Sequence, residues 1–215
     1  MKIGVFDSGV GGLSVANAIK KALPEQEIIL REDKAHLPYG TRPPKEILGF
    51  VTPIFQEMID SGCQVIVVAC NTVSTTLIGE LRQRFDVPMV AIEPMVKPAA
   101  ALTKSGVIAV CATPTTLASA RYTQLKRDYA KDVTVLEPDC ADWSAMIEHK
   151  RVDDEKISSR INQVLDSGAD VIVLGCTHYH WIEEDVKKLA AGRAQVLQPE
   201  PAIIEQLKRV LEQLA

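Results

Sequence analysis

Two cysteines occupy equivalent positions in a segment that occurs twice in the chain. Residues 61–73 read SGCQVIVVACNTV and residues 167–179 read SGADVIVLGCTHY, which aligns Cys70 with Cys176. Each copy is rich in Val and Ile and predicts a buried parallel strand, and each thiol ends that strand, just before polar residues that could begin a helix. Ligands bind at this carboxyl end of the strands in open α/β sheets. We therefore expect two thiols, one from each half of the chain, at one small ligand pocket.

Two thiols on opposite faces of a substrate can transfer protons in both directions. One thiolate removes a proton from a carbon while the neutral thiol opposite delivers one, which inverts the centre. Near-attack distances of about 3 to 3.5 Å on each side place the sulfur atoms about 7 Å apart, whereas a disulfide needs about 2 Å. Amides at the helix starts are expected to lower the thiol pKa from its usual value of about 8.5. The other cysteines, at positions 63, 111 and 140, fit better as small buried hydrophobic residues.

An acid and a histidine are predicted to lie at the same sheet edge as the thiols. Asp7 follows the first predicted strand, KIGVF at residues 2–6, and His178 comes two residues after Cys176. A carboxylate near one thiol and an imidazole near the other could receive or supply protons. Asp7 could instead cap the next helix, and His178 could be a surface or capping residue. Their joint placement at one edge favours the catalytic interpretation.

The segment DSGVGG at residues 7–12 is rich in glycine. Glycines allow tight or positive-φ conformations and a close approach of the backbone to a ligand. The segment lacks the third glycine of a GxGxxG dinucleotide loop and follows an acid, so nucleotide binding is disfavoured. The start of the following helix is instead expected to hold an anion, because free amides and the helix dipole favour negative charge there.

Strands alternate with helices along the whole chain, which is typical of parallel sheets with helices on both faces. The segment IGVFDS at residues 3–8 is echoed by VIAVCAT at residues 107–113, so the second half begins near residue 106. We predict an α/β fold with two pseudosymmetric lobes, each a mostly parallel sheet flanked by helices, with the active site between them. The predicted first lobe comprises residues 1–95 with the C-terminal segment 190–215, and the second lobe comprises residues 96–189.

The loop AHLPYGTRPP at residues 35–44 has two equally supported interpretations, a surface connection and a flap over the strand ends. The helix predicted after it contains Pro53, where a kink or break is expected.

Composition excludes several classes of protein. The chain has 215 residues, of which 47% are hydrophobic and 24% charged, which is ordinary for a globular chain with a core. No run approaches the roughly 18 apolar residues of a membrane span, and the start MKIGVFDSGVGG is too polar for a signal peptide. Five cysteines without close spacing indicate neither disulfides nor a zinc site. A net charge of −4 without a basic cluster argues against nucleic acid. We expect a cytoplasmic protein with neither a metal nor a membrane or nucleic-acid partner.

The chain resembles the glutamate racemases of the aspartate/glutamate racemase superfamily. Six motifs carry the resemblance, in the family's order and across nearly the whole chain: DSGVGGL at 7–13, LPYG at 37–40, VACNT at 68–72, AIEP at 91–94, TPTT at 113–116 and LGCTHY at 174–179. The resemblance implies interconversion of L- and D-glutamate without a cofactor, which supplies D-glutamate for bacterial cell-wall peptidoglycan. It also implies a homodimer in which two similar lobes enclose the amino-acid substrate.

The resemblance also implies roles for individual residues. Cys70 and Cys176 would be the proton donors and acceptors, Asp7 and His178 would support them, and Glu148 in the MIEHK segment would be a further helper. The positions that match substrate contacts are Asp7, Ser8, Tyr39, Gly40, Asn71, Thr72, Thr113, Thr116, Thr177 and His178.

The chain departs from the family pattern near the second thiol. Pro and Leu usually follow GCTHY, whereas His180 and Trp181 stand here, and His149 follows Glu148 where a second acid is common. The chain is also a few tens of residues shorter than expected. These departures leave open an aspartate or broad-specificity amino-acid racemase, and a non-catalytic binding or regulatory protein with the same fold. Another two-thiol enzyme, such as a hydantoin racemase or a maleate isomerase, is disfavoured by DSGVGGL and PYG. Retention of both thiols with Asp7 and His178 favours catalysis.

Overall fold

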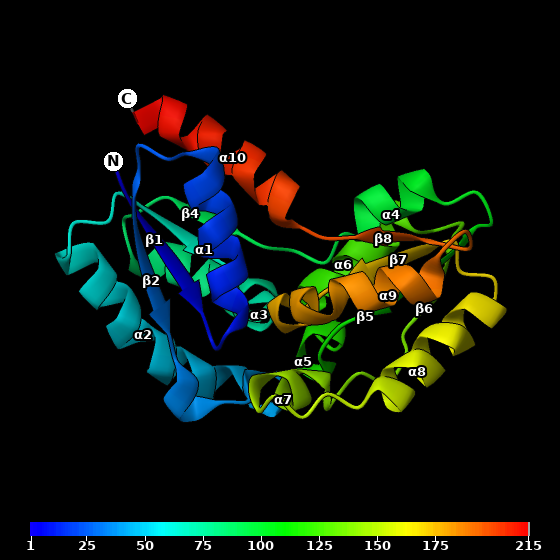
Figure 1. Ribbon diagram of the computed structural model, residues 1–215. Coiled ribbons are helices and arrows are strands. Elements are labelled where there is room, and N and C mark those ends of the chain that lie inside the picture. The colour runs from blue at the N-terminus through cyan, green and yellow to red at the C-terminus, as the bar shows by residue number, and fades with distance from the viewer. Residues whose placement is uncertain (215) are drawn as a thin grey trace.

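A computed structural model describes residues 1–214, which form two lobes that each contain a four-stranded parallel sheet (Figure 1). The strand order of the first sheet is β2-β1-β3-β4 and that of the second is β6-β5-β7-β8, so the two lobes repeat one topology. The strands are β1 (Lys2–Asp7), β2 (Glu27–Glu32), β3 (Val65–Val68), β4 (Met89–Ala91), β5 (Val107–Cys111), β6 (Thr134–Leu136), β7 (Val171–Leu174) and β8 (Gln195–Leu197). The predicted α/β fold with two pseudosymmetric lobes is confirmed.

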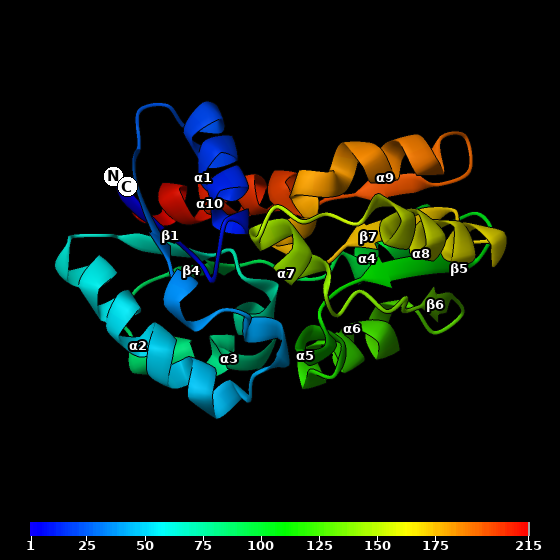
Figure 2. The same cartoon turned by 60° about the horizontal axis from the view of Figure 1, so that its bottom comes forward.

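Helices cover both faces of each sheet (Figure 2). In the first lobe α1 (Gly11–Ala22) and α10 (Glu200–Leu214) pack on one face, and α2 (Pro44–Asp60) and α3 (Asn71–Arg84) pack on the other. The second lobe contains α4 (Val96–Leu102), α5 (Pro114–Leu117), α6 (Ala120–Tyr129), α7 (Trp143–Glu148), α8 (Asp154–Asp166) and α9 (Glu183–Ala190). Short 3₁₀ turns are η1 (Lys34–His36), η2 (Tyr39–Thr41) and η3 (Thr177–Ile182).

The central strands are buried on both faces, as their Val- and Ile-rich sequences require. All residues of β3 and β7 are buried, which fits a parallel sheet enclosed by helices. Helix α2 places Ile47, Val51, Phe55 and Met58 on its buried face, a helical spacing of apolar residues. The helix continues through Pro53 without the expected break. Proline has no N–H group, so the Gly49 carbonyl lacks its usual helical hydrogen bond from residue 53. Gly49 and Pro53 are both exposed, so water can bind that carbonyl.

The predicted lobe boundary at residue 190 is corrected by the structure. Strand β8 pairs in parallel with β7, through Val171 with Gln195 and Val173 with Leu197, so it belongs to the second sheet. Only α10 returns to the first lobe, where it packs beside α1 (Figure 1). The sequence did not indicate which sheet this strand joins, because three residues are too few for a pattern that distinguishes one sheet from the other. Position 215 lies outside the described residues.

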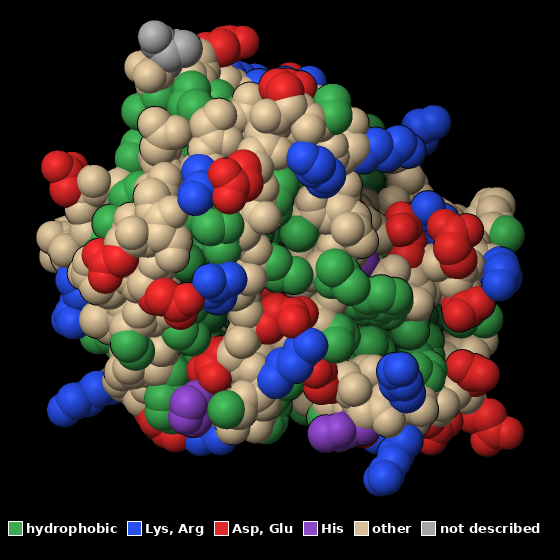
Figure 3. Space-filling view, turned by 60° about the vertical axis from the view of Figure 1, so that its left-hand side comes forward, with side chains coloured by type: hydrophobic (Ala, Val, Ile, Leu, Met, Phe, Trp, Pro, Cys, Tyr) green, Lys and Arg blue, Asp and Glu red, His purple; other side chains and the backbone are tan. Residues whose placement is uncertain are grey.

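The surface mixes charges of both signs. On the face seen in Figure 3, acidic and basic side chains are interspersed, and neither sign gathers into a large patch among the described residues. Within residues 1–214 none of the helices has the length and apolar character needed to cross a membrane.

The glycines after β1 allow the two lobes to touch. A Cβ on Gly11 would lie 2.4 Å from Thr177 Oγ1 and 2.6 Å from the Thr177 carbonyl carbon. A Cβ on Gly9 would lie 2.5 Å from Glu148 Oε2. Neither glycine has a positive φ; within the described chain that conformation is found at glycines 62, 106, 168 and 192 and at Lys150. The glycine-rich segment therefore serves close approach between lobes rather than an unusual backbone conformation.

We expect Gly11→Ala to destabilise the protein, because the new methyl group meets the Thr177 backbone, which cannot move away alone. Overpacking of this kind costs about 1 to 3 kcal/mol, measurable as a lower melting temperature in calorimetry. Gly79→Ala is the matched control, since Gly79 is exposed inside α3 and its added Cβ meets nothing within 4 Å. That variant should gain about 0.5 to 1 kcal/mol. Equal stability of Gly11→Ala and the parent protein would contradict the close contact.

Candidate active site

A cavity of about 260 Å³ lies between the lobes, where the carboxyl ends of the two sheets face each other. The first lobe contributes Ser8, Lys34, Leu37, Pro38, Tyr39, Gly40, Cys70, Asn71 and Thr72 to its lining. The second lobe contributes Thr113, Ser144, Ala145, Glu148, His149, Cys176, Thr177 and His178. Cys70 and Cys176 thus border one cavity, each from its own lobe.

Cys70 lies between β3 and α3 in a site that favours the neutral thiol. Its side chain is 5% exposed, and the Ser8 hydroxyl lies 3.5 Å from the sulfur. Burial, followed by the negative charge of Asp7, raises the pKa of Cys70 to about 12. The amide of Val73 opposes this shift but does not outweigh it. The expectation that helix amides lower the pKa of this thiol is therefore wrong, because removal of the sulfur from water dominates.

Cys176 lies in a different environment, beside a histidine and an acid. The sulfur is 3.9 Å from His178 Nδ1, and the opposite ring nitrogen lies 2.7 Å from Glu148 Oε2. Burial lowers the pKa of the ring, but its hydrogen bonds to Cys176 and Glu148 outweigh burial and raise the pKa of His178 to about 10. The hydrogen bond from His178 in turn lowers the pKa of Glu148. The ring is therefore a cation at neutral pH, in position to exchange a proton with the sulfur.

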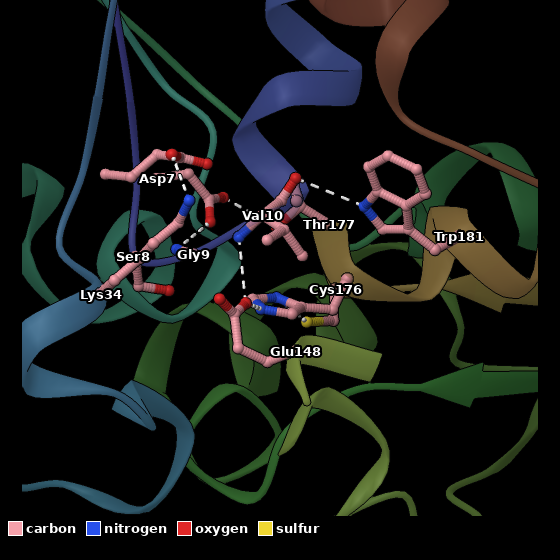
Figure 4. A network of polar contacts seen from close by, with 12 residues as sticks. Asp7, Ser8, Gly9, Val10, Lys34, Glu148, Cys176, Thr177 and Trp181 are labelled. Atoms are coloured by element: carbon pink, nitrogen blue, oxygen red, sulfur yellow. Dashed lines mark hydrogen bonds and ion pairs between the residues drawn. The ribbon is translucent and has the colours of Figure 1, made fainter. Parts of the chain in front are cut away.

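Glu148 is also the anion that lies at the start of α1. Its Oε2 accepts a hydrogen bond of 3.0 Å from the Val10 amide, in the turn that leads into the helix (Figure 4). The anion held there is a carboxylate of the protein itself, contributed by the other lobe. Sequence reasoning identified the site but not its occupant, because 138 residues separate the two partners.

Asp7 does not line the cavity, although we predicted it as a substrate contact. One carboxylate oxygen accepts from the Gly9 amide at 2.8 Å and the other from the Thr177 hydroxyl at 2.7 Å (Figure 4). Complete burial raises the pKa of Asp7, against the opposing charge of His178. Asp7 does not cap α1 through its side chain either. It links the lobes from behind the cavity wall.

The predicted substrate-binding residues divide into two groups. Ser8, Tyr39, Gly40, Asn71, Thr72, Thr113, Thr177 and His178 line the cavity, whereas Asp7 and Thr116 do not. The Thr116 hydroxyl lies behind the wall and accepts a hydrogen bond from Thr113 Oγ1 at 3.0 Å. Thr113 also contacts Thr72 Oγ1 across the lobes at 3.1 Å.

Asn71 is the side chain in the cavity wall that is free to bind a ligand. It is buried, and neither its amide nitrogen nor its oxygen has a partner among the described residues. Buried polar groups are normally paired, so a ligand that fills the cavity would satisfy it. The position at the start of α3 adds free backbone amides and a helix dipole that favours negative charge.

The loop at residues 35–44 forms part of the cavity wall. Tyr39 is buried, and its hydroxyl donates a hydrogen bond of 2.5 Å to Asp33 Oδ2. Of its two predicted interpretations, the structure therefore supports a segment packed over the strand ends.

Six lining residues were not predicted as site residues: Lys34, Leu37, Pro38, Ser144, Ala145 and His149. Lys34 follows the end of β2 by two residues and pairs with Glu32 Oε2 at 2.9 Å. Because Lys34 follows a strand at the sheet edge where ligands bind, the sequence could have predicted it as a site residue. Ser144 and Ala145 lie on α7, which follows no cavity-facing strand directly, so nothing in the sequence marked them.

This fold and cavity define a class of two-lobed α/β proteins in which a thiol from each lobe borders a cavity between the sheets. Such an arrangement is suited to proton transfer at a carbon atom.

Comparison with known proteins identifies the family. The family model described as Asp/Glu/Hydantoin racemase matches residues 3–207, so the chain belongs to that family. The glutamate racemase of Roseiflexus sp. (strain RS-1) is 35% identical over 216 residues, which cover 98% of this chain and 79% of that protein. The glutamate racemase of Pseudomonas paraeruginosa (strain DSM 24068 / PA7) is 38% identical and covers 97% and 81%.

Solved structures show the same fold. The crystal structure of Escherichia coli glutamate racemase in complex with L-glutamate and the activator UDP-MurNAc-Ala superposes with a TM-score of 0.88 at 30% identity, covering 98% of this chain and 82% of that one. A glutamate racemase from Bacillus anthracis superposes with a TM-score of 0.83 at 28% identity, covering 99% and 82%.

We expect His178 to titrate near pH 10, and Glu148→Gln to move this midpoint downward by removing the carboxylate that stabilises the cation. Because the folded pKa lies above the usual value of about 6.5, the protonated ring stabilises the fold fully below that pH. This contribution is lost as the pH rises through about 10. NMR of the imidazole C–H signals, assigned with His178→Gln, measures the midpoint. A His178 midpoint near pH 6.5 in the parent protein would contradict the contacts of His178 with Cys176 and Glu148.

Proposed function

We propose that this chain is a cofactor-independent racemase that interconverts L- and D-glutamate. The observation that carries the proposal is the presence of one buried thiol from each lobe, Cys70 and Cys176, at a single interlobe cavity. The family match and the glutamate racemases at 35–38% identity support it. The structure of the Escherichia coli relative, which was solved with L-glutamate, supports the substrate.

The two thiols would act as a pair with different resting states. Cys70, whose pKa is raised to about 12, would hold its proton and act as the donor. Cys176 would start as the base, a thiolate whose negative charge is stabilised by the His178 cation, which Glu148 holds in place. As the thiolate removes the α-proton on one face, the bonding pair passes to the α-carbon and towards the carboxylate. Cys70 then delivers a proton on the opposite face and becomes the thiolate, so the reverse reaction begins from that state.

Other residues would hold the substrate and the site. The Asn71 amide would donate to the α-carboxylate, where negative charge develops during the reaction. Asp7 would act by position, since it holds Thr177 and raises the pKa of Cys70 without lining the cavity. On the family resemblance, we extend the proposal to D-glutamate supply for peptidoglycan in the cytoplasm and to a homodimer.

The cavity charge favours an acidic amino acid. Among the described residues that line the cavity, Lys34 is the one lysine, and there is no arginine. Its side chain is 54% exposed and forms an ion pair with Glu32. A half-exposed lysine can turn from a surface carboxylate to a ligand at little cost, because exposed ion pairs contribute only about 0 to 1 kcal/mol. We propose that Lys34 receives the distal carboxylate of glutamate.

We expect Cys70→Ala and Cys176→Ala each to lose racemisation of L-glutamate by about 10² to 10⁴-fold or more, the usual contribution of a positioned acid or base. Loss of optical rotation measures the complete inversion, and α-hydrogen exchange in deuterated water measures proton removal. Cys63→Ala, a buried thiol outside the cavity lining, is the control and should keep activity. Full activity in either test variant would remove the two-base mechanism. Parallel assays with L-aspartate decide between the two acidic substrates, and exchange with neither would indicate a non-catalytic protein.

We expect Lys34→Met to raise the KM for glutamate about tenfold with little change in kcat, because a charge-assisted hydrogen bond to the substrate is lost. Lys34→Arg should stay close to the parent enzyme. Lys45→Met, an exposed lysine of α2 outside the cavity lining, controls for the change in net charge. An unchanged KM in Lys34→Met would place the distal carboxylate elsewhere.

A further inference from the structure

The turn η3 carries the second half of the site and is bound to the first lobe at several points. Cys176 stands at its N-terminus, and Thr177 donates to Asp7. Further along the turn, Trp181 Nε1 donates to the Val10 carbonyl at 3.3 Å, so Val10 is held through its amide by Glu148 and through its carbonyl by Trp181 (Figure 4).

His180 makes a further contact of this turn with the first lobe. Its side chain is 3% exposed, and Nδ1 lies 2.9 Å from Glu200 Oε1 and 3.1 Å from Ser14 Oγ. The Ser14 hydroxyl donates to the Gly11 carbonyl at 2.9 Å, so its oxygen is left to accept. A carboxylate and a hydroxyl oxygen at the same nitrogen assign the proton to Nδ1. Nε2 is buried without a partner among the described residues, which costs less for a bare acceptor nitrogen than for an unpaired N–H.

The three partners come from three different elements. Ser14 lies on α1 and Glu200 begins α10, and both helices pack on the first sheet. His180 comes from the second lobe, four residues after Cys176. The Nδ1–H group of His180 therefore links two helices of the first lobe to the turn η3, which follows Cys176.

We propose that His180 is a positioning residue whose Nδ1–H, shared by Ser14 and Glu200, sets the place of Cys176 relative to Cys70. Two thiols that act on one carbon from different lobes must each be held near 3 to 3.5 Å from it, and a displacement of about 1 Å can cost about 10²-fold in rate. The kinetic part of the inference rests on the proposed racemase function.

Three substitutions separate the hydrogen bond from packing. Asn places an N–H donor near the position of Nδ1, Gln places it near that of Nε2, and Ala removes it. We expect His180→Ala and His180→Gln to lower kcat for glutamate about 10- to 100-fold while KM changes little, and His180→Asn to retain most of the parent kcat. Melting temperatures of all three variants show whether each one folds. Unchanged kcat in His180→Ala, or an equal loss in the Asn variant, would overturn the inference.

Two readouts do not depend on turnover. Amide hydrogen exchange of residues 177–182, and the rate of Cys176 alkylation by iodoacetamide relative to Cys70, should both rise in the Ala and Gln variants and not in the Asn variant. If the parent protein fails to racemise glutamate, the proposed function fails, and these measurements still decide whether His180 holds the turn. Exchange and alkylation rates that are the same in all variants would overturn the positioning role.

Discussion

The site depends on hydrogen bonds between the loop after β1 and the far lobe. Asp7 accepts from Thr177, and Glu148 accepts from the Val10 amide. The two thiols belong to separate sheets with separate cores, so packing within either lobe cannot set their separation. Only contacts across the cavity can do so. Gly11 must lack a side chain for the same reason, since the Thr177 backbone occupies the space of a Cβ.

The two halves are similar in topology but not in chemistry. The strands that lead to the thiols have the same place in their sheets, yet Cys70 lies near a buried acid and Cys176 near a histidine. Burial and the charge of Asp7 favour the neutral form of the first thiol, whereas the second thiol lies beside the His178 cation, which Glu148 stabilises. The symmetric fold thus provides two thiols in different environments. A reaction that removes one proton from a carbon and delivers another needs one base and one acid at the start of each turnover.

Much of this arrangement was predictable because it is local or repeated. The duplicated Val- and Ile-rich segments predicted β3 and β7, and the strand-end rule brought Cys70, Asn71, Cys176 and His178 to one sheet edge. Predictions went wrong where they required knowledge of a partner. We predicted that residues 195–197 belong to the first lobe, but they complete the second sheet. The contacts of Asp7 could not be predicted either, because the Thr177 hydroxyl that donates to it is 170 residues away in the chain.

The sequence by itself determined the fold class, the repeat and the thiol pair, because periodicity and residue type act over short distances along the chain. Only the tertiary structure decided the protonation state of Cys70, the cation at His178 and the links from His180 to Ser14 and Glu200. These properties arise from burial and from neighbours far away in the chain. A pKa or a contact between lobes depends on which groups share a small volume, and that is settled only when both lobes are folded and in contact.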